Sequence, residues 1–514
     1  MPRQVAAVES PSDNEDSRSV IGTSRTMSPP DPLTQTDTAL PTVATAAGLP
    51  PEPTRSTSSL AATQTVVAPP SRSLVRIQLL VGAVMVAIAI FAAVRVAMIE
   101  GLPLPGVSPV ARVDGPSMAP AYLGAHYRVI CEDCGFAWCC DAEHAPASRE
   151  ASCPNCGYPT NTLRDEDLVA GERVLIDRWP VAVRGARPGE VVAALDPAHA
   201  GGLVIKRVAA RPGQRLAIRG GDLVVDDRLV RKSWEELAQV RVLVHDNNFQ
   251  PRKSTGVPDR WQRVGESSWH SALTGFRCQP GREPWQWLEY SHHQMFGWHS
   301  RTRQSPVLDL DSYNPLETRL LNSVPDVFVS CRLRASGGEG QFAFAAIDGD
   351  ARFEATIDPR RQTAELAEIG PQDQRRVVAR QPEIFLDLGD RFVAVEFGLC
   401  DQQVFLRLAG RQLFRHDYTR SSVKRDALHP LAIGSKGLAL AVDELRVWRD
   451  IYYLAPDGSG SDWSLPAEVS AGSLPLLGDN TTVSVDSRNW TSGVLPDQVR
   501  GIVYKPFWAN RLRE

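Results

Sequence analysis

The 514-residue sequence lacks a strong excess of charge of either sign. Lysine and arginine number 56, aspartate and glutamate number 60, and the formal net charge is -4. Proteins that bind nucleic acid through its phosphates concentrate positive charge on one face, and no basic stripe with interleaved aromatic residues occurs here. The sequence therefore argues against a nucleic-acid partner.

Residues 1–72 contain almost no clusters of aromatic or large aliphatic side chains and are rich in proline, serine, threonine and alanine. Such a segment cannot bury enough apolar surface to offset the entropy lost on ordering. We therefore expect residues 1–72 to be disordered. The whole length exceeds what one hydrophobic core usually organises, so two to four domains are expected.

Long hydrophobic runs are also scarce, and only one is long enough to cross a bilayer. Eighteen uncharged, mostly apolar residues separate Arg76 from Arg95, which predicts a transmembrane helix over residues 73–99. The long segment before it favours an uncleaved anchor over a cleaved signal peptide. Arg72 and Arg76 before the run and Glu100 after it place the N-terminus in the cytoplasm, although Arg95 weakens this bias.

The stretch VDGPSMAP, which contains Ser117, follows this run closely. Glycine and proline flanks are typical of turns, so an ordinary turn hydroxyl is one interpretation. Further along, short apolar runs broken by Pro-Gly and Gly-Gly-Asp predict consecutive strands with tight turns. In the strand LVIKRVA the side chains of Lys206 and Arg207 point to opposite faces.

If the face of this strand that carries Lys206 packs against the protein interior, the lysine is buried and can take a chemical role. Lysine tolerates burial by losing its proton, whereas arginine stays charged and must point outward or be paired. A neutral amine at Lys206 is a candidate general base for a serine hydroxyl. The alternative is an edge strand with both cations in solvent.

A third polar stretch, LPLLGDNTTVSVDSRNW, lies near the C-terminus. In extended backbone Ser484, Asp486 and Arg488 share one face, so the acid and the arginine form a fixed pair beside the serine hydroxyl. The preceding Gly-Asp-Asn supplies turn residues and backbone donors. A loop ion pair without chemistry is the alternative.

Taken in order, these pieces resemble the bacterial type I signal peptidases, membrane-bound serine endopeptidases that use a Ser/Lys dyad. The resemblance rests on GPSMAP, GERVLIDRW, RPGEVVAA, VIKRVAARPG, GDNTTVSVDSRNW and LPDQVRGIVY. It implies Ser117 as nucleophile, Lys206 as general base and no cofactor for catalysis. The further implied residues are Ser484, which orients the amine; Asp486 and Arg488, which brace the loop; Gly478, Asp479 and Asn480, which form its turn; Met118, which lines the substrate pocket; and Arg207 beside the base.

The same resemblance implies secretory preproteins as substrates, cleaved after small residues of the Ala-x-Ala type. Shallow apolar pockets lined by strand residues such as Val174 and Ile176 would select those residues. Some family members carry a serine two positions before the nucleophile as an oxyanion donor, and here that position is Gly115. The backbone N–H of Ser117, or another donor, must then stabilise the oxyanion.

Nine cysteines are present, and four of them have the spacing of a zinc ribbon. Cys131-x2-Cys134 and Cys153-x2-Cys156 are separated by 18 residues, as in two knuckles that close a tetrahedral site. We favour structural zinc, which would brace the loop or form a docking surface beside the active site. Two disulfides are the alternative outside the cytoplasm. Three nearby residues are alternate ligands: Cys139, Cys140 and His144.

A second insertion, residues 233–450, contains alternating stretches such as VFVSCRLRA, GQFAFAAI, ARFEATI and LALAVDELRVW, with turn signals between them. These predict a separate β-sandwich, with a faint resemblance to laminin-G or concanavalin-like domains. Five tryptophans between Trp261 and Trp298 suggest stacking on a carbohydrate or contact with a protein, although clustered tryptophan is more often core or interface. At most one disulfide can form among Cys278, Cys331 and Cys400.

The predicted architecture is mainly β. A signal-peptidase-like catalytic core follows one transmembrane helix and carries an inserted zinc ribbon and an inserted β-sandwich. Its parts are residues 1–72 (disordered), 73–99 (anchor), 105–130, 165–232 and 451–514 (catalytic core), 131–160 (zinc ribbon) and 233–450 (sandwich).

The predicted location is the inner membrane with the catalytic part outside the cytoplasm, next to the bilayer and its preproteins. Two other functions fit part of the sequence. One is a membrane-anchored binding or scaffolding protein with a degenerate peptidase core. The other is a soluble self-cleaving Ser/Lys repressor, which the anchor and the lack of a DNA-binding segment disfavour.

Overall fold

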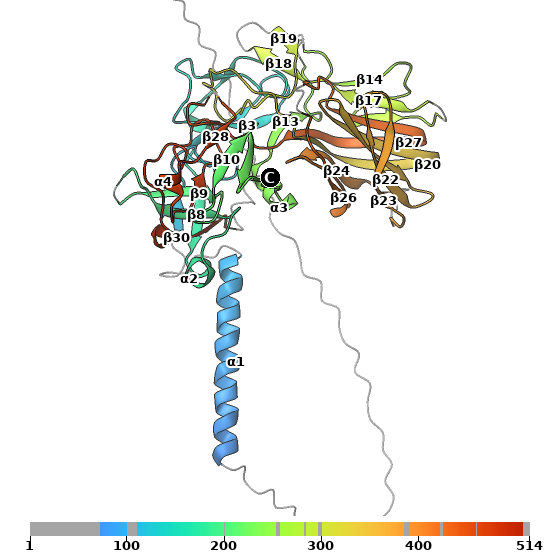
Figure 1. Ribbon diagram of the computed structural model, residues 1–514. Coiled ribbons are helices and arrows are strands. Elements are labelled where there is room, and N and C mark those ends of the chain that lie inside the picture. Colours follow the sequence, from blue (N-terminus) through green and yellow to red (C-terminus); the bar gives the residue numbers. More distant parts are fainter. Residues whose placement is uncertain are drawn as a thin grey trace, which may run out of the picture. The chain divides into compact units, whose positions relative to one another are not determined.

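The computed structural model describes residues 72–99, 110–199, 201–252, 257–281, 284–296, 301–384, 391–421, 425–458 and 460–506. The prediction of disorder concerns residues 1–72 and falls almost entirely outside these ranges. In the described chain, one helix is long and apolar enough to cross a membrane: α1, Arg72–Ile99, with a span of mean hydropathy 2.7 from Arg76 to Arg95 (Figure 1). The expected single-pass anchor is consistent with this helix.

The first β region is a six-stranded antiparallel sheet assembled from distant parts of the chain. Its order is β1 (Val110–Arg112), β7 (Arg173–Asp177), β30 (Val499–Tyr504), β8 (Val191–Leu195), β9 (Leu203–Val208) and β29 (Leu476–Leu477). The apolar runs RVLID and VVAAL are almost fully buried, as expected for interior strands. The C-terminal strands therefore return to complete a sheet that the N-terminal strands begin.

The chain also forms a smaller sheet from strands that follow β9 and precede β29. Its order is β12 (Arg228–Leu229), β11 (Asp222–Val225), β10 (Leu216–Arg219) and β28 (Trp463–Ser464). The turn between β10 and β11 uses Gly220 and Gly221 at φ of +58° and +88°, a backbone region open mainly to glycine. The consecutive short strands predicted from Pro-Gly and Gly-Gly-Asp are confirmed. The short helices are α2 (Trp179–Arg184), α3 (Trp234–Val240) and α4 (Ala467–Ser470), with 3-10 turns at Asp165–Asp167 and Pro496–Gln498.

The cysteine-rich segment forms two small sheets of its own. One has the order β3 (Ala137–Asp141), β2 (His126–Ile130) and β6 (Leu168–Val169), and the other pairs β4 (Glu150–Ala151) with β5 (Asn161–Thr162). The four cysteines of the ribbon spacing lie in the small hydrophobic core between these strands.

The second insertion forms a separate, larger β network around its own core. Two long strands, β20 (Val327–Asp348) and β27 (Leu431–Arg449), pair along most of their length, with three register shifts that bend them. The other strands of the network are β13 (Val242–Asp246), β14 (Trp261–Arg263), β15 (His270–Ala272), β16 (Gly275–Cys278), β17 (Gln286–Tyr290), β21 (Ala351–Asp358), β22 (Thr363–Ile369), β23 (Arg375–Gln381), β24 (Val393–Cys400), β25 (Gln403–Leu408) and β26 (Arg411–Asp417). A separate hairpin pairs β18 (His293–Phe296) with β19 (Arg301–Gln304).

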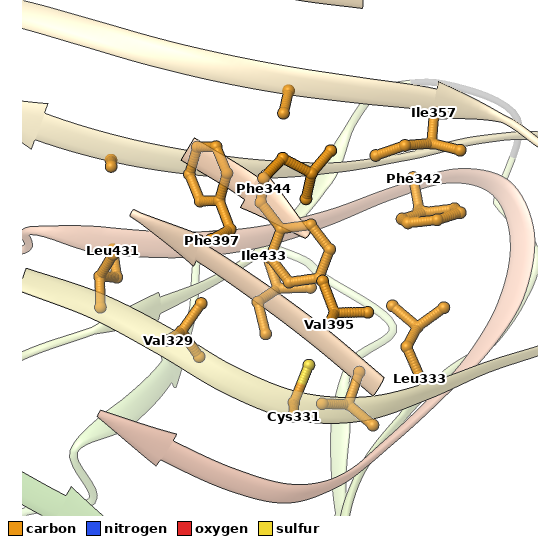
Figure 2. Close-up of a cluster of buried hydrophobic side chains, with 14 of the residues drawn as sticks. Val329, Cys331, Leu333, Phe342, Phe344, Ile357, Val395, Phe397, Leu431 and Ile433 are labelled. Atoms are coloured by element: carbon orange, nitrogen blue, oxygen red, sulfur yellow. The ribbon is translucent and has the colours of Figure 1, made fainter. Parts of the chain in front are cut away.

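Figure 2 shows the core of this insertion, in which Phe342, Phe344, Phe397 and Ile433 point toward one another between strands. The stretches VFVSCRLRA and GQFAFAAI, expected as two strands, belong to the single strand β20. One register shift against β27 lies inside the first stretch, between Ser330 and Arg332. Two more lie between Ala335 and Gln341, where the break was expected.

A buried ion cluster lies where the chain enters this insertion, just after β12 of the smaller sheet. Lys232 Nζ lies 2.5 Å from Asp401 Oδ1 and 2.7 Å from Asp450 Oδ2. Helix α3 follows directly, and a capping box between Ser233 and Glu236 caps its N-terminus. The chain therefore enters the insertion through a fixed helix start and a buried ion pair.

Candidate functional site

Ser117 lies in a compact turn that follows β1. The N–H of Ala119 donates to the carbonyl of Pro116 at 3.1 Å, and the N–H of Tyr122 donates to that of Met118 at 2.7 Å. Met118 is only 1% exposed and packs in a core cluster with Val174 and Ile176. These three side chains pack in the core beneath the turn, and their role in lining a substrate pocket remains a prediction.

Lys206 is placed on β9 with its amine inside the protein. The side chain is 3% exposed, and Nζ donates a hydrogen bond to Ser484 Oγ at 3.1 Å. Burial lowers the pKa of Lys206 from 10.5 to about 8, against the opposing charge of Asp486. A substantial fraction of the amine is then neutral near physiological pH.

Arg207, the next residue, faces the other way and is also buried. It forms a two-pronged pair with Asp479, with Nε to Oδ1 at 2.8 Å and Nη2 to Oδ2 at 2.7 Å, and donates to the carbonyl of Gly189. The sequence predicted that Arg207 either points to solvent or forms an ion pair. In the structure it forms an ion pair with Asp479.

Ser484, Asp486 and Arg488 form a connected group, although their backbone is not extended. The expected strand is wrong: residues 481–490 form turns, in which Asp486 Oδ1 accepts from the N–H of Arg488 at 3.1 Å. The Asp486 carboxylate also accepts from Ser484 Oγ at 2.8 Å, Arg488 Nη2 at 2.8 Å and the N–H of Gly478 at 2.9 Å. Burial alone raises the pKa of Asp486, but these hydrogen bonds outweigh it and hold the pKa below its usual value.

The loop Gly478–Asn480 connects this group to the Ser117 turn. The backbone N–H of Asn480 donates to the carbonyl of Ser117 at 3.0 Å, and its side-chain amide donates to the carbonyl of Pro116 at 3.2 Å. A Cβ placed on Gly478 would lie 2.1 Å from Ser484 Oγ and 2.5 Å from the carbonyl oxygen of Ser117. Only glycine therefore allows the serine hydroxyl and the Ser117 turn to approach from both sides.

The structure thus brings together Lys206, Ser484, Asp486 and Arg488, and it ties the backbone of Ser117 to the same loop. Within the described ranges, the Ser117 hydroxyl itself makes no hydrogen bond. Catalytic hydrogen bonds are often loose before substrate binds, so this geometry leaves the role of Ser117 a prediction. At Gly115 an added Cβ would meet only Glu143 Oε2, at 4.0 Å, so packing does not require glycine there.

One residue in contact with this loop was missed by sequence reasoning. Asn314, from the second insertion, exchanges two hydrogen bonds with Asn480. No local motif marks Asn314, and its separation from residue 480 in the chain hides the contact.

The four cysteines with the ribbon spacing converge on one point. Their sulfur atoms all lie within 4.8 Å of one another, with Cys131 and Cys156 at 3.5 Å and Cys134 and Cys153 at 3.8 Å. All four are free thiols in the structure, which contains neither of the two disulfides given as the alternative. Four thiolates about 2.3 Å from a tetrahedral zinc have sulfurs about 3.8 Å apart, so the donor set fits a structural metal ion.

The two knuckles have the same backbone. Gly135 and Gly157 both have φ of +78°, and each donates its N–H to the carbonyl of the first cysteine of its pair, Cys131 or Cys153. Cys139, Cys140 and His144 are not part of the cluster: Cys140 accepts from Trp138 Nε1, and His144 contacts Asp141. Assignment as a zinc ribbon remains a prediction.

In the second insertion, Cys278, Cys331 and Cys400 are buried free thiols. Trp261 and Trp269 belong to its core, whereas Trp285 and Trp287 stack on each other with ring centroids 5.5 Å apart. Trp298 lies outside the described residues. A ligand of this insertion remains a prediction.

The comparison with protein families gives one match. Residues 159–262 match the family described as "Signal peptidase, peptidase S26", which supports a relationship to the signal peptidases, a class of serine peptidases. The matched range contains Lys206 and Arg207 but neither Ser117 nor the loop at residues 478–488. No curated protein matches the chain.

Several solved structures are similar to part of the chain. A carbohydrate-binding module, CBM66 from Bacillus subtilis, covers 37% of this chain and 94% of its own at 10% identity, with a TM-score of 0.25. A Bacillus subtilis protein of unknown function with a galectin-like fold covers 40% and 96% at 8% identity, with a TM-score of 0.27. Galectin LEC-6 of Caenorhabditis elegans covers 24% and 83% at 7% identity, with a TM-score of 0.19. Similarity this low identifies no ligand.

Proposed function

We propose that this chain is a membrane-anchored serine endopeptidase of the signal-peptidase type, with Ser117 as nucleophile and Lys206 as general base. The observation that carries the proposal is the buried Lys206 amine, which is hydrogen-bonded to Ser484 and has its pKa lowered to about 8. Burial of an amine beside a nucleophile-bearing turn is the arrangement that a lysine base needs.

In this mechanism neutral Lys206 accepts the proton of the Ser117 hydroxyl as Oγ attacks the scissile carbonyl carbon. The resulting ammonium then protonates the leaving amine, and an acyl ester on Ser117 remains. Lys206 next takes a proton from the water that attacks the ester, and it returns this proton to the departing Ser117 Oγ as the new C-terminal carboxyl group is released. Because Lys206 donates one hydrogen to Ser484 Oγ, its lone pair stays available for the Ser117 proton.

The oxyanion formed at each step needs donors in place beforehand. The N–H of Ser117 gives no hydrogen bond to a protein acceptor within the described residues, so it is available for this role. Asn480 fixes the backbone on both sides of that N–H, through the carbonyls of Pro116 and Ser117.

The substrate would bind as an added strand beside β9. Strand β29 pairs only with Arg207 and Val208, which leaves the edge of Leu203–Lys206 without a strand partner in the described structure. An extended peptide can use such an edge for backbone hydrogen bonds. Ile205 and Ala111 are the partly buried rim of the core cluster under the Ser117 turn, and in this proposal they form the shallow surface that accepts small residues.

The anchor has a clear purpose in this scheme. Signal peptides lie in the bilayer with their cleavage sites at its surface, so a protease tethered to the same membrane meets them at a raised effective concentration. We place the N-terminus in the cytoplasm and the catalytic part on the outer side of the inner membrane.

The test uses the full chain in detergent and a preprotein with an Ala-x-Ala site. Wild type should cut after the second alanine, and Ser117→Ala and Lys206→Met should each abolish cleavage. Lys436→Met, at a half-buried lysine of the second insertion, is the matched control and should cut like wild type. Wild-type protein that is folded yet inactive on several such preproteins would overturn the proposal and favour the binding or scaffolding function.

A further inference from the structure

Asn314 lies in a segment of the second insertion that reaches the Ser117 turn. Its Nδ2 donates to Asn480 Oδ1 at 2.8 Å, and Asn480 Nδ2 donates back to Asn314 Oδ1 at 2.8 Å. Asn314 Nδ2 also donates to Thr482 Oγ1 at 2.8 Å. Both asparagines are buried, so these hydrogen bonds are not exchanged freely with water.

We infer that Asn314 is a positioning residue for the Ser117 nucleophile, supplied by the insertion and acting through Asn480. The inference rests on the proposed function. Asn480 touches the nucleophile segment by its backbone N–H, which donates to Ser117, and by its side chain, which donates to Pro116. Asn314 sets the orientation of the Asn480 side-chain amide, because Asn314 Nδ2 faces Asn480 Oδ1 and Asn314 Oδ1 faces Asn480 Nδ2.

The segment that carries Asn314 is held from three directions. Arg449, at the end of β27, donates to the carbonyls of Asp309 and Leu310 at 3.2 and 2.9 Å. The carbonyl of Tyr313 accepts the backbone N–H of Asp141, at the end of β3, at 2.8 Å. The Tyr313 side chain packs with Ala119 and Leu123, which directly follow the nucleophile.

This arrangement makes the insertion part of the catalytic framework. A flipped or displaced Asn480 amide would lose the hydrogen bond to Pro116 and loosen the turn that presents Ser117. Misplacement of a reacting group by about 1 Å can cost about a hundredfold in rate. Since Asn314 lies behind the loop, its loss should lower kcat and leave KM nearly unchanged.

The decisive variant is Asn314→Asp, which keeps the shape and changes only the hydrogen bonding. An ionised aspartate can accept from Asn480 Nδ2 but repels Asn480 Oδ1, so we expect kcat to fall about tenfold or more at pH 8. A protonated aspartate restores the donor. The ratio of variant to wild-type kcat should therefore rise as the pH falls, once each kcat is divided by the neutral fraction of Lys206 taken from that protein's own pH profile, because a nearby carboxylate raises the Lys206 pKa. Charged groups on this segment are Asp311 and Glu317. Those on the elements packed against it are Arg449 of β27, Asp141 of β3, and Asp479, Asp486 and Arg488 of the loop that Asn314 contacts.

Asn322→Ala is the matched control, because Asn322 donates to Asp309 on the same segment and does not contact the loop. It should keep the wild-type kcat. A variant ratio for Asn314→Asp that does not change with pH, or an equal loss in Asn322→Ala, would show that the residue only supports packing and would overturn the inference.

Hydrogen–deuterium exchange of the full chain separates this inference from the proposed function. Asn314→Asp should speed exchange in peptides covering residues 478–486, where the Asn480 N–H donates to Ser117, and Asn322→Ala should not. Unchanged exchange in Asn314→Asp would refute the coupling even if wild type cleaves preproteins. If exchange is faster in Asn314→Asp but wild type cleaves no preprotein, the structural coupling stands and the peptidase role is refuted. A positioning role for Asn314 in catalysis is then refuted as well.

Discussion

The pH dependence of cleavage is the most direct test of Lys206 as a base. With a pKa of about 8, about a tenth of the amine is neutral at pH 7 and about half at pH 8. A lysine with the ordinary pKa of 10.5 would be neutral in fewer than about one molecule in a thousand at pH 7. We expect kcat/KM to rise about tenfold between pH 6 and pH 7 and to level off above pH 8.

The measurement is the initial rate of preprotein cleavage at low substrate concentration from pH 5.5 to 10, since kcat/KM reports groups of the free enzyme. Lys206→Arg is the informative control, because a guanidinium keeps its proton throughout this range and should be inactive at every pH. A midpoint near 10.5, a rate independent of pH, or an active arginine variant would refute the lysine-base mechanism.

Stability gives an independent measure of the same pKa. The unfolded chain binds the Lys206 proton with a pKa near 10.5 and the folded chain with a pKa of about 8, so the unfolded state carries more protons between these values. The contribution of Lys206 to the free energy of unfolding should therefore rise with pH across this window, by about 3 kcal/mol in total. The difference in free energy of unfolding between wild type and Lys206→Met, measured by denaturant unfolding at several pH values, should show this rise.

Three further predictions concern other parts of the structure. Gly478→Ala should abolish cleavage with little change in secondary structure by circular dichroism, because its Cβ would collide with Ser484 Oγ and the Ser117 carbonyl. Cys134→Ser should lower the zinc content found by elemental analysis and the melting temperature, because a structural site loses one of four thiolates. Lys232→Met should lower the free energy of unfolding by about 3–5 kcal/mol, because Asp401 and Asp450 would stay buried without their cation.

Each of these predictions has a control in the same chain. Gly337→Ala tests for a general glycine effect, because Gly337 has open space around its Cβ position, and it should keep activity. Cys278→Ser lies outside the cysteine cluster and should keep the zinc content. Lys436→Met should cost far less stability than Lys232→Met. Wild-type behaviour in Gly478→Ala, Cys134→Ser or Lys232→Met would contradict the corresponding reasoning.

Local patterns in the sequence predicted the elements that local physics controls. The run from Arg76 to Arg95 predicts a helix because its length and hydropathy suit a bilayer whatever the rest of the chain does. The paired Cys-x2-Cys knuckles predict the converging thiolates because each knuckle is a short, self-contained turn with a glycine after its second cysteine. The short strands around Gly220 and Gly221 follow from turn chemistry in the same way.

The sequence was less reliable where conformation depends on contacts from elsewhere. The sequence correctly grouped Ser484, Asp486 and Arg488, but it predicted a strand where the structure has turns. The buried Asp486 carboxylate accepts hydrogen bonds from Gly478 and Arg488, and the turns bring these donors to it. The packing of Val174 and Ile176 against Met118 also depends on such contacts, because β7 and the Ser117 turn come from separate parts of the chain.

By itself, the sequence determined which residue types are available for chemistry and where the chain turns, because these depend on neighbours a few positions away. Only the tertiary structure decided that Lys206 is buried against Ser484, that Arg207 is paired with Asp479, and that Asn314 of the insertion reaches Asn480. Burial, the lowered pKa that follows from it, and contacts between distant segments all arise from packing the whole chain, which no local pattern records.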